Sequence, residues 1–180
     1  MRFIDLDTVP WAYEAISTLA DRGIINGRSD ELFEPNDTVT REEFVKICVN
    51  ICGLDSSDKT VVFSDEVSGE WYTGYLKAAY DSGLVRGRDD GTFGIGEPVS
   101  RQDMAVILYN IIKAHIDSVK EPQNKFDDAD VISEYAKDAV SCLSELGIIN
   151  GTGDNLFSPL DTATRAEAAK MAFGILEYVK

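Results

Sequence analysis

The feature that most constrains this chain is a pentapeptide bounded by glycines that occurs three times. It reads Gly-Ile-Ile-Asn-Gly at 23–27, Gly-Leu-Val-Arg-Gly at 83–87 and Gly-Ile-Ile-Asn-Gly at 147–151. An aromatic residue lies 12 positions before each first glycine, a phenylalanine 10 positions after it and an arginine 18 positions after it. Landmarks that keep their register three times indicate a tandem repeat, and repeats this small bury their apolar faces against one another.

Each copy opens with Phe-x-Asp, which adds a fifth landmark. The aspartates are Asp5, Asp65 and Asp128. The aromatic residues are Trp11, Trp71 and Tyr135, and the glycines that close the pentapeptides are Gly27, Gly87 and Gly151. The arginines are Arg41, Arg101 and Arg165.

Two helices are predicted in each copy. In the first copy, apolar residues at helical spacing mark a helix from about residue 11 to residue 22, and Gly23 follows where a left-handed residue ends a helix. A second helix should begin within Thr40-Arg41-Glu42-Glu43, a capping box in which Thr40 is the N-cap. The box recurs as Ser100-Arg101-Gln102-Asp103 and Thr164-Arg165-Ala166-Glu167. We therefore predict an all-α protein of three repeats, 1–54, 55–118 and 119–180, packed as one unit.

Charge restricts the partners that the chain can have. Its 180 residues carry a net charge of −15, which repels nucleic acid and anionic membranes at long range. An anionic ligand would therefore need a local cluster of donors. No run of 18 apolar residues predicts a membrane span, and the first residues lack a signal-peptide core. The chain is then either cytosolic or a segment of a larger secreted protein.

Cysteine, histidine and acidic clusters give no sign of redox or metal chemistry. Cys48, Cys52 and Cys142 occupy apolar positions of the repeat and are predicted to be buried hydrophobic residues, while His115 is predicted at the surface. The acidic stretches 89–91 and 127–130 lack the terminal glutamate of a twelve-residue calcium loop. We predict no metal and no cofactor.

Taken together, these motifs resemble the S-layer homology repeat. The likeness rests on Phe-x-Asp, the aromatic residue, Gly-Ile-Ile-x-Gly, Phe-x-Pro and Thr-Arg-x-Glu, and it covers essentially the whole chain in the usual number of three. The resemblance implies a pseudo-threefold helical assembly whose grooves between repeats hold a secondary cell-wall polysaccharide that bears pyruvate ketals. It implies a non-covalent anchor with no enzymatic activity, outside the cell, as a monomeric module of a larger surface protein.

The resemblance makes the three arginines the main ligand residues, and it extends the site to the aspartates, aromatic residues and closing glycines named above. Physical reasoning supports a ligand role for the arginines. A cation at the first helical position opposes the helix dipole, yet an arginine occupies that position in all three copies. A helix N-terminus with free N–H groups and a guanidinium would suit a carboxylate. The alternative for each arginine is a solvated side chain.

Other positions leave alternatives open. The aromatic residues either offer a face to a sugar or fill the core. The aspartates cap the first helix, the interpretation we favour, or bind sugar hydroxyls. The glycines are interpreted as turn residues that would contact a ligand only because they lie next to it. Departures from the repeat fall mostly in the second copy. It has Arg86 where the others have asparagine, and Gly94-Ile95 where they have Glu34-Pro35 and Ser158-Pro159. The alternative function is a helical-repeat module that binds proteins, and a wall-degrading activity would need residues outside this segment.

Overall fold

A computed structural model describes residues 3–113, 116 and 125–179. In this part of the chain the regular structure is helical, and β-bridges occur only singly. The α-helices are α1 (Tyr13–Asp21), α2 (Arg41–Cys52), α3 (Thr73–Asp81), α4 (Arg101–Ile112), α5 (Lys137–Glu145) and α6 (Arg165–Gly174). Short 3-10 helices are η1 (Leu6–Thr8), η2 (Pro10–Ala12), η3 (Ala129–Val131) and η4 (Glu134–Ala136). The predicted all-α fold class is confirmed.

Capping residues set the starts of the inner helices α2, α4 and α6. The Thr40 hydroxyl accepts the N–H of Glu43 (3.4 Å) while the Glu43 carboxylate accepts the N–H of Thr40 (3.0 Å), and Thr164 and Glu167 repeat this pair. At α4 only half of the box forms: Ser100 accepts the N–H of Asp103 (3.2 Å), and the shorter Asp103 side chain binds other partners. The predicted box is therefore confirmed twice and wrong in its second half at α4.

Left-handed glycines follow the outer helices α1, α3 and α5, as predicted. Gly23, Gly83 and Gly147 have φ of 70°, 74° and 70°, and each lies two residues after its helix. This conformation is costly for residues with a Cβ, so glycine ends the helix at that point.

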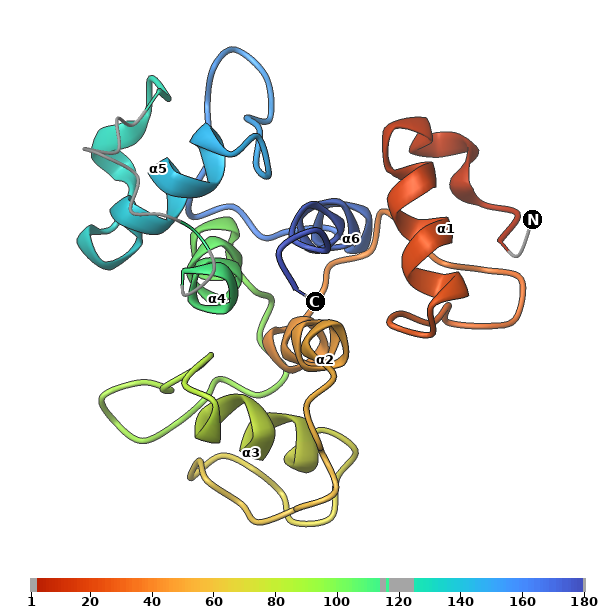
Figure 1. Cartoon of the computed structure of the whole chain (residues 1–180), viewed down its shortest axis with the longest axis vertical. Coiled ribbons are helices and arrows are strands. Elements are labelled where there is room, and N and C mark those ends of the chain that lie inside the picture. The colour runs from red at the N-terminus through yellow and green to blue at the C-terminus, as the bar shows by residue number, and fades with distance from the viewer. Residues whose placement is uncertain (1–2, 114–115, 117–124, 180) are drawn as a thin grey trace.

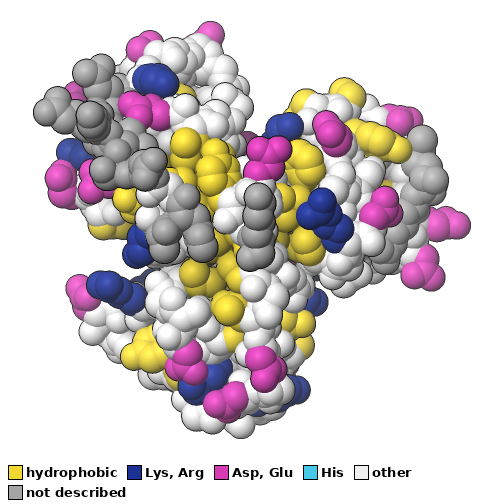
Figure 2. All heavy atoms as spheres, viewed as in Figure 1, with side chains coloured by type: hydrophobic (Ala, Val, Ile, Leu, Met, Phe, Trp, Pro, Cys, Tyr) yellow, Lys and Arg dark blue, Asp and Glu magenta, His cyan; other side chains and the backbone are white. Residues whose placement is uncertain are grey.

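The outer helix of each repeat packs on the inner helix of a different repeat. Figure 1 shows α2, α4 and α6 side by side at the centre and α1, α3 and α5 around them. α2 packs on α3, α4 on α5, and α6 returns to α1, so the third repeat closes on the first. Figure 2 shows hydrophobic side chains gathered where the three lobes meet and acidic side chains spread over their outer surface.

Three backbone hydrogen bonds join the segments that precede the inner helices. The N–H of Val39 donates to Ala163 O (3.1 Å), that of Ala163 to Val99 O (3.1 Å), and that of Val99 to Val39 O (3.0 Å). These bonds form a closed ring with one member from each repeat. The ring joins the three copies, while their packing as one unit, the symmetry that relates them and the repeat boundaries stay predictions. The boundary at 118/119 and His115 lie outside the described residues.

Burial of the cysteines is confirmed for two of the three. Cys48 and Cys142 are buried and Cys52 is half-buried, and all three are free thiols. Burial raises the pKa of each thiol, which keeps them protonated and unreactive. None of the helices within the described ranges is long and apolar enough to cross a membrane.

Candidate functional site

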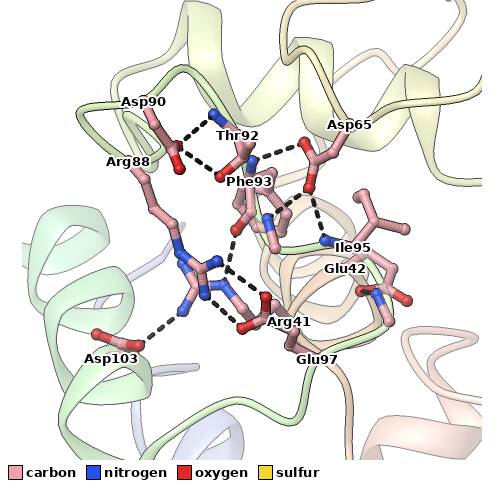
Figure 3. Close-up of polar contacts among 12 residues, drawn as sticks. Arg41, Glu42, Asp65, Arg88, Asp90, Thr92, Phe93, Ile95, Glu97 and Asp103 are labelled. Atoms are coloured by element: carbon pink, nitrogen blue, oxygen red, sulfur yellow. Dashed lines mark hydrogen bonds and ion pairs between the residues drawn. The ribbon is translucent and has the colours of Figure 1, made fainter.

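The Phe-x-Asp aspartates fix the loop that leads to each inner helix. Asp65 accepts the backbone N–H groups of Phe93 (2.7 Å), Gly94 (2.7 Å) and Ile95 (2.9 Å), as Figure 3 shows. Asp5 and Asp128 accept the corresponding groups in their own repeats, from residues 33–34 and 157–158. The N-cap positions of the outer helices α1, α3 and α5 are Ala12, Tyr72 and Ala136. The predicted capping role of the aspartates is therefore wrong, because the unpaired N–H groups of a distant loop take the carboxylate.

Acid should destabilise the protein through Asp65. Burial raises the pKa of this carboxyl, but the three N–H donors outweigh burial and hold the pKa below its usual value. A depressed pKa adds stability that is complete above the unfolded-state value and is lost as pH falls through the folded-state value. We expect the free energy of unfolding of the wild type to fall more steeply than that of Asp65→Asn between about pH 5 and pH 2. Thermal unfolding followed by circular dichroism checks this, and equal slopes would contradict it.

Each of the three arginines reaches into the next repeat around the ring. The Nε of Arg41 donates to Phe93 O (2.9 Å), that of Arg101 to Phe157 O (2.8 Å), and that of Arg165 to Phe33 O (2.9 Å). Each guanidinium also lies over the ring of the same phenylalanine, at 5.0, 5.2 and 4.5 Å from its centroid. The alternative of solvated side chains is wrong, since these contacts hold the junctions between repeats.

The N–H groups at the starts of the inner helices are not free for a ligand. The backbone N–H of Arg41 donates to Glu97 O (3.0 Å), that of Arg101 to Asp161 O (3.0 Å), and that of Arg165 to Asp37 O (2.8 Å). The expectation of a receptor made partly of free N–H groups is therefore wrong.

The remaining guanidinium nitrogens distinguish the three arginines. Arg101 is 5% exposed and donates to Glu167 Oε1 (2.9 Å) and Asn150 O (3.2 Å). Arg41 donates through Nη1 to Asp103 Oδ2 (2.6 Å; Figure 3). Arg165 donates through Nη2 to Asn26 O (3.0 Å), and within the described residues no carboxylate forms an ion pair with it.

A cavity of about 260 Å³ lies beside Arg165, and all three repeats line it. The first repeat contributes Ile24 to Arg28, Phe33, Val39 and the α2 residues Glu43, Lys46 and Ile47; the second contributes Trp71; the third contributes Arg165 and Ala169. The cavity therefore exists only when the three repeats are assembled.

Cations dominate the charged lining of this cavity. Arg28, Lys46 and Arg165 carry positive charge, and Glu43 is the acid among the lining residues. Burial lowers the pKa of Arg165 and the nearby Arg28 lowers it further, an effect that Glu43 and two other acids offset only in part. A guanidinium stays charged at such a site. In a chain of net charge −15, these three residues form a local cluster of cationic donors.

The aromatic residues of the motif lie at the surface. Trp11, Trp71 and Tyr135 are 51%, 45% and 60% exposed, so the core-filling alternative is wrong. Trp71 lines the cavity, and the ammonium of Lys46 lies over the Trp71 ring, 5.4 Å from a ring centroid. The Tyr135 hydroxyl donates to Asp103 Oδ1 (2.7 Å) and accepts from Gln102 Nε2 (3.0 Å). Burial and the hydrogen bond to Asp103 raise the pKa of Tyr135 to about 12.

The closing glycines permit a close approach to the phenylalanine of Phe-x-Asp. A Cβ at Gly27 would lie 2.5 Å from Phe3 Cε1 and from Leu32 O. A Cβ at Gly87 would overlap the Phe63 ring in the same way, whereas one at Gly151 would lie 3.4 Å from Phe126 Cε1 and 2.6 Å from Leu156 O. Gly87 alone of the three has a positive φ (75°). Gly27 also lines the cavity, so its proximity to a ligand follows from its place in the turn.

Sequence reasoning missed several residues of the cavity. Arg28, Glu43 and Lys46 line it, and Asn26 supplies the carbonyl that binds Arg165. Arg28 follows the predicted Gly27 directly, so adjacency could have indicated it. The capping box indicates only a capping role for Glu43, and Lys46 recurs as Lys170 but not in the second copy, which has Val106.

Comparison with known proteins gives a family and several relatives. The family model described as the S-layer homology domain matches residues 2–45, 62–105 and 125–169. The chain is 36% identical over 170 residues to Exoglucanase XynX of Acetivibrio thermocellus, and 35% identical over 170 residues to an Amylopullulanase of Thermoanaerobacterium thermosulfurigenes. It is 31% identical over 169 residues to S-layer protein sap of Bacillus anthracis. Each match covers 93% of this chain but only 16%, 9% and 20% of the respective relative.

Proposed function

The chain belongs to the S-layer homology family, and on that premise we propose that it is a carbohydrate-binding module that anchors a larger protein non-covalently at the bacterial cell wall. Relatives with different names support attachment as the shared role. Two are named for enzymes and one as an S-layer protein, yet the matching segment is a small part of each. A segment common to proteins of such different names has a role that they share. We propose that this role is to fix their location at the cell wall.

The ligand we propose is a cell-wall polysaccharide that carries pyruvate ketals, bound in a groove between repeats. The observation that carries this proposal is the cavity beside Arg165, with three cations and Trp71 around one opening. A guanidinium pairs with a carboxylate through charge-assisted hydrogen bonds, and an exposed indole offers an apolar face to a sugar ring. A ketal of pyruvate presents both groups within one residue of the glycan.

The second candidate is a module that binds an acidic protein. The same cations favour it, because an acidic peptide also presents carboxylates. The two candidates differ in the chemistry that the partner must supply, since only the glycan loses its charge when its ketals are removed.

Sedimentation with purified cell wall tests the proposal. We expect the wild type to bind intact wall, and to lose binding both when mild acid removes the ketals and when Arg41→Ala and Arg165→Ala are combined. Because direct arginine–carboxylate contacts are screened less than diffuse attraction, binding should persist at about 0.15 M salt. Binding that ignores both the ketals and the arginines would refute the anchoring proposal.

A further inference from the structure

The three junctions between repeats share one frame but differ in charge. At each junction an arginine at the first position of one inner helix lies near the acid at the third position of the next inner helix. Arg41 pairs with Asp103 (2.6 Å) and Arg101 with Glu167 (2.9 Å). At the junction of Arg165 the corresponding acid is Glu43, and it pairs instead with Arg28 (2.6 Å).

From this difference we infer that the Arg165 junction is the one that takes a carboxylate-bearing sugar, and that Arg28 is the positioning residue that makes it competent by holding Glu43 in a separate ion pair. This inference rests on the proposed function and deepens it. It assigns the ligand to one of three grooves and gives a role to a residue outside the repeat motif.

The counterparts of Arg28 do not act in this way at the other junctions. Arg88 has the same place in the second repeat, but it donates to Glu97 Oε1 (2.9 Å) and leaves Asp103 to Arg41. Figure 3 shows both pairs side by side. In the third repeat the position is Thr152, whose hydroxyl lies 3.2 Å from Ser158 Oγ. A threonine has no charge with which to draw Glu167 away from Arg101.

Internal partners already occupy the other two guanidinium groups. All three nitrogens of Arg101 donate to acceptors in the third repeat, and the side chain is 6% exposed. Asp103 binds Arg41 through one oxygen and the Tyr135 hydroxyl through the other, which ties this pair to a third element. A ligand carboxylate would have to displace a carboxylate of the protein at either place.

The Arg165 junction has room and charge for a ligand. Across the described part of the chain, Nη1 of Arg165 makes no hydrogen bond, and the cavity opens beside it. Lys46 adds a third cation there; the same position is Val106 in the second repeat and Lys170 in the third, so this lysine distinguishes the Arg165 junction from that of Arg41 only. Trp71 completes the lining with an exposed indole. A small sugar with one carboxylate matches this combination.

Calorimetric titration with a methyl hexopyranoside that carries one pyruvate ketal tests the inference, with its carboxyl methyl ester as the neutral control. We expect one site per chain, and binding of the ester that is weaker by about tenfold or more. Arg165→Ala should weaken binding of the acid by about 10- to 100-fold. Thermal unfolding of each variant verifies that the fold is retained.

Variants of Arg28 separate positioning from direct contact. Arg28→Thr, which copies Thr152, releases Glu43 to pair with Arg165 and should weaken binding by about tenfold. Adding Glu43→Gln keeps an acceptor for the Thr40 N–H but removes the competing charge, so the double variant should return to within about threefold of the wild type. The matched control Arg88→Thr should bind as the wild type does.

Several outcomes would overturn the inference. Two or three equal sites, full affinity in Arg165→Ala, or a double variant as weak as Arg28→Thr would each do so. If the wild type still sediments with intact wall but not with wall stripped of ketals, these outcomes leave the anchoring function in place. A wild type that binds neither the acidic sugar nor the wall would instead refute the proposed function itself.

Discussion

Replacing Arg101 with alanine should lower the free energy of unfolding by about 3–5 kcal/mol. The guanidinium is buried, lies over the Phe157 ring and serves as donor to two carbonyls and to Glu167. Its removal leaves the carbonyls of Phe157 and Asn150 without their donor and a partly buried carboxylate without its cation. Burial lowers the pKa of Arg101 below its usual value, and the surrounding acids, Glu167 first, offset this only in part.

Arg165→Ala is the matched control for this prediction. It removes the same two carbonyl bonds and ring contact at another junction, but no ion pair with a carboxylate of the described chain. We expect it to cost about 1–2 kcal/mol. Urea unfolding of the two variants measures both values. Equal losses would show that the internal ion pair of Arg101 adds nothing to stability.

Gly87→Ala should destabilise the protein by about 2–5 kcal/mol in total. Part of this cost is conformational, because Gly87 has φ of 75°, where an L residue is strained. The remainder is steric, since a Cβ would overlap the Phe63 ring and lie 3.0 Å from Thr92 O. Phe63 is buried against Phe93, with ring centroids 5.2 Å apart, so the ring cannot move without disturbing the core.

Gly83→Ala separates the two contributions. Gly83 has nearly the same φ (74°), but a Cβ there would have no neighbour within 4 Å. We expect it to lose only the conformational part, about 1–2 kcal/mol. Thermal or urea unfolding gives both losses. If the two variants lose the same stability, close approach to Phe63 is not the reason for glycine at position 87.

Local features of the fold could be predicted from the sequence because neighbouring residues determine them. Thr40 and Glu43 are three positions apart and satisfy each other's backbone groups, so their spacing is sufficient evidence for a helix start. Gly23 ends α1 through its own backbone conformation. Most of the apolar positions of the inner helices, Cys48 included, are buried as their periodicity indicated, while Ile47, Ile51, Cys52 and Leu176 are half-buried.

The site could be predicted only in part, because its contacts join residues far apart in the sequence. Repeat comparison identified Arg165, but nothing near it indicates that its partner is the carbonyl of Phe33, 132 residues away. Asp5 was assigned to the adjacent helix because local capping is the common role, whereas its N–H donors lie 28 and 29 residues on. The role of Glu43 depends on whether Arg28 or Arg165 holds it, a competition between two distant cations.

The closed ring of backbone bonds among Val39, Val99 and Ala163 has a consequence for how variation acts on this protein. An open stack of repeats has two ends that need caps, whereas a ring has none. Residues of adjacent repeats then line each groove together, and every repeat borders two grooves. A substitution in a single copy can alter the donors of one groove and the walls of the next. The three junctions between repeats therefore cannot vary independently of one another.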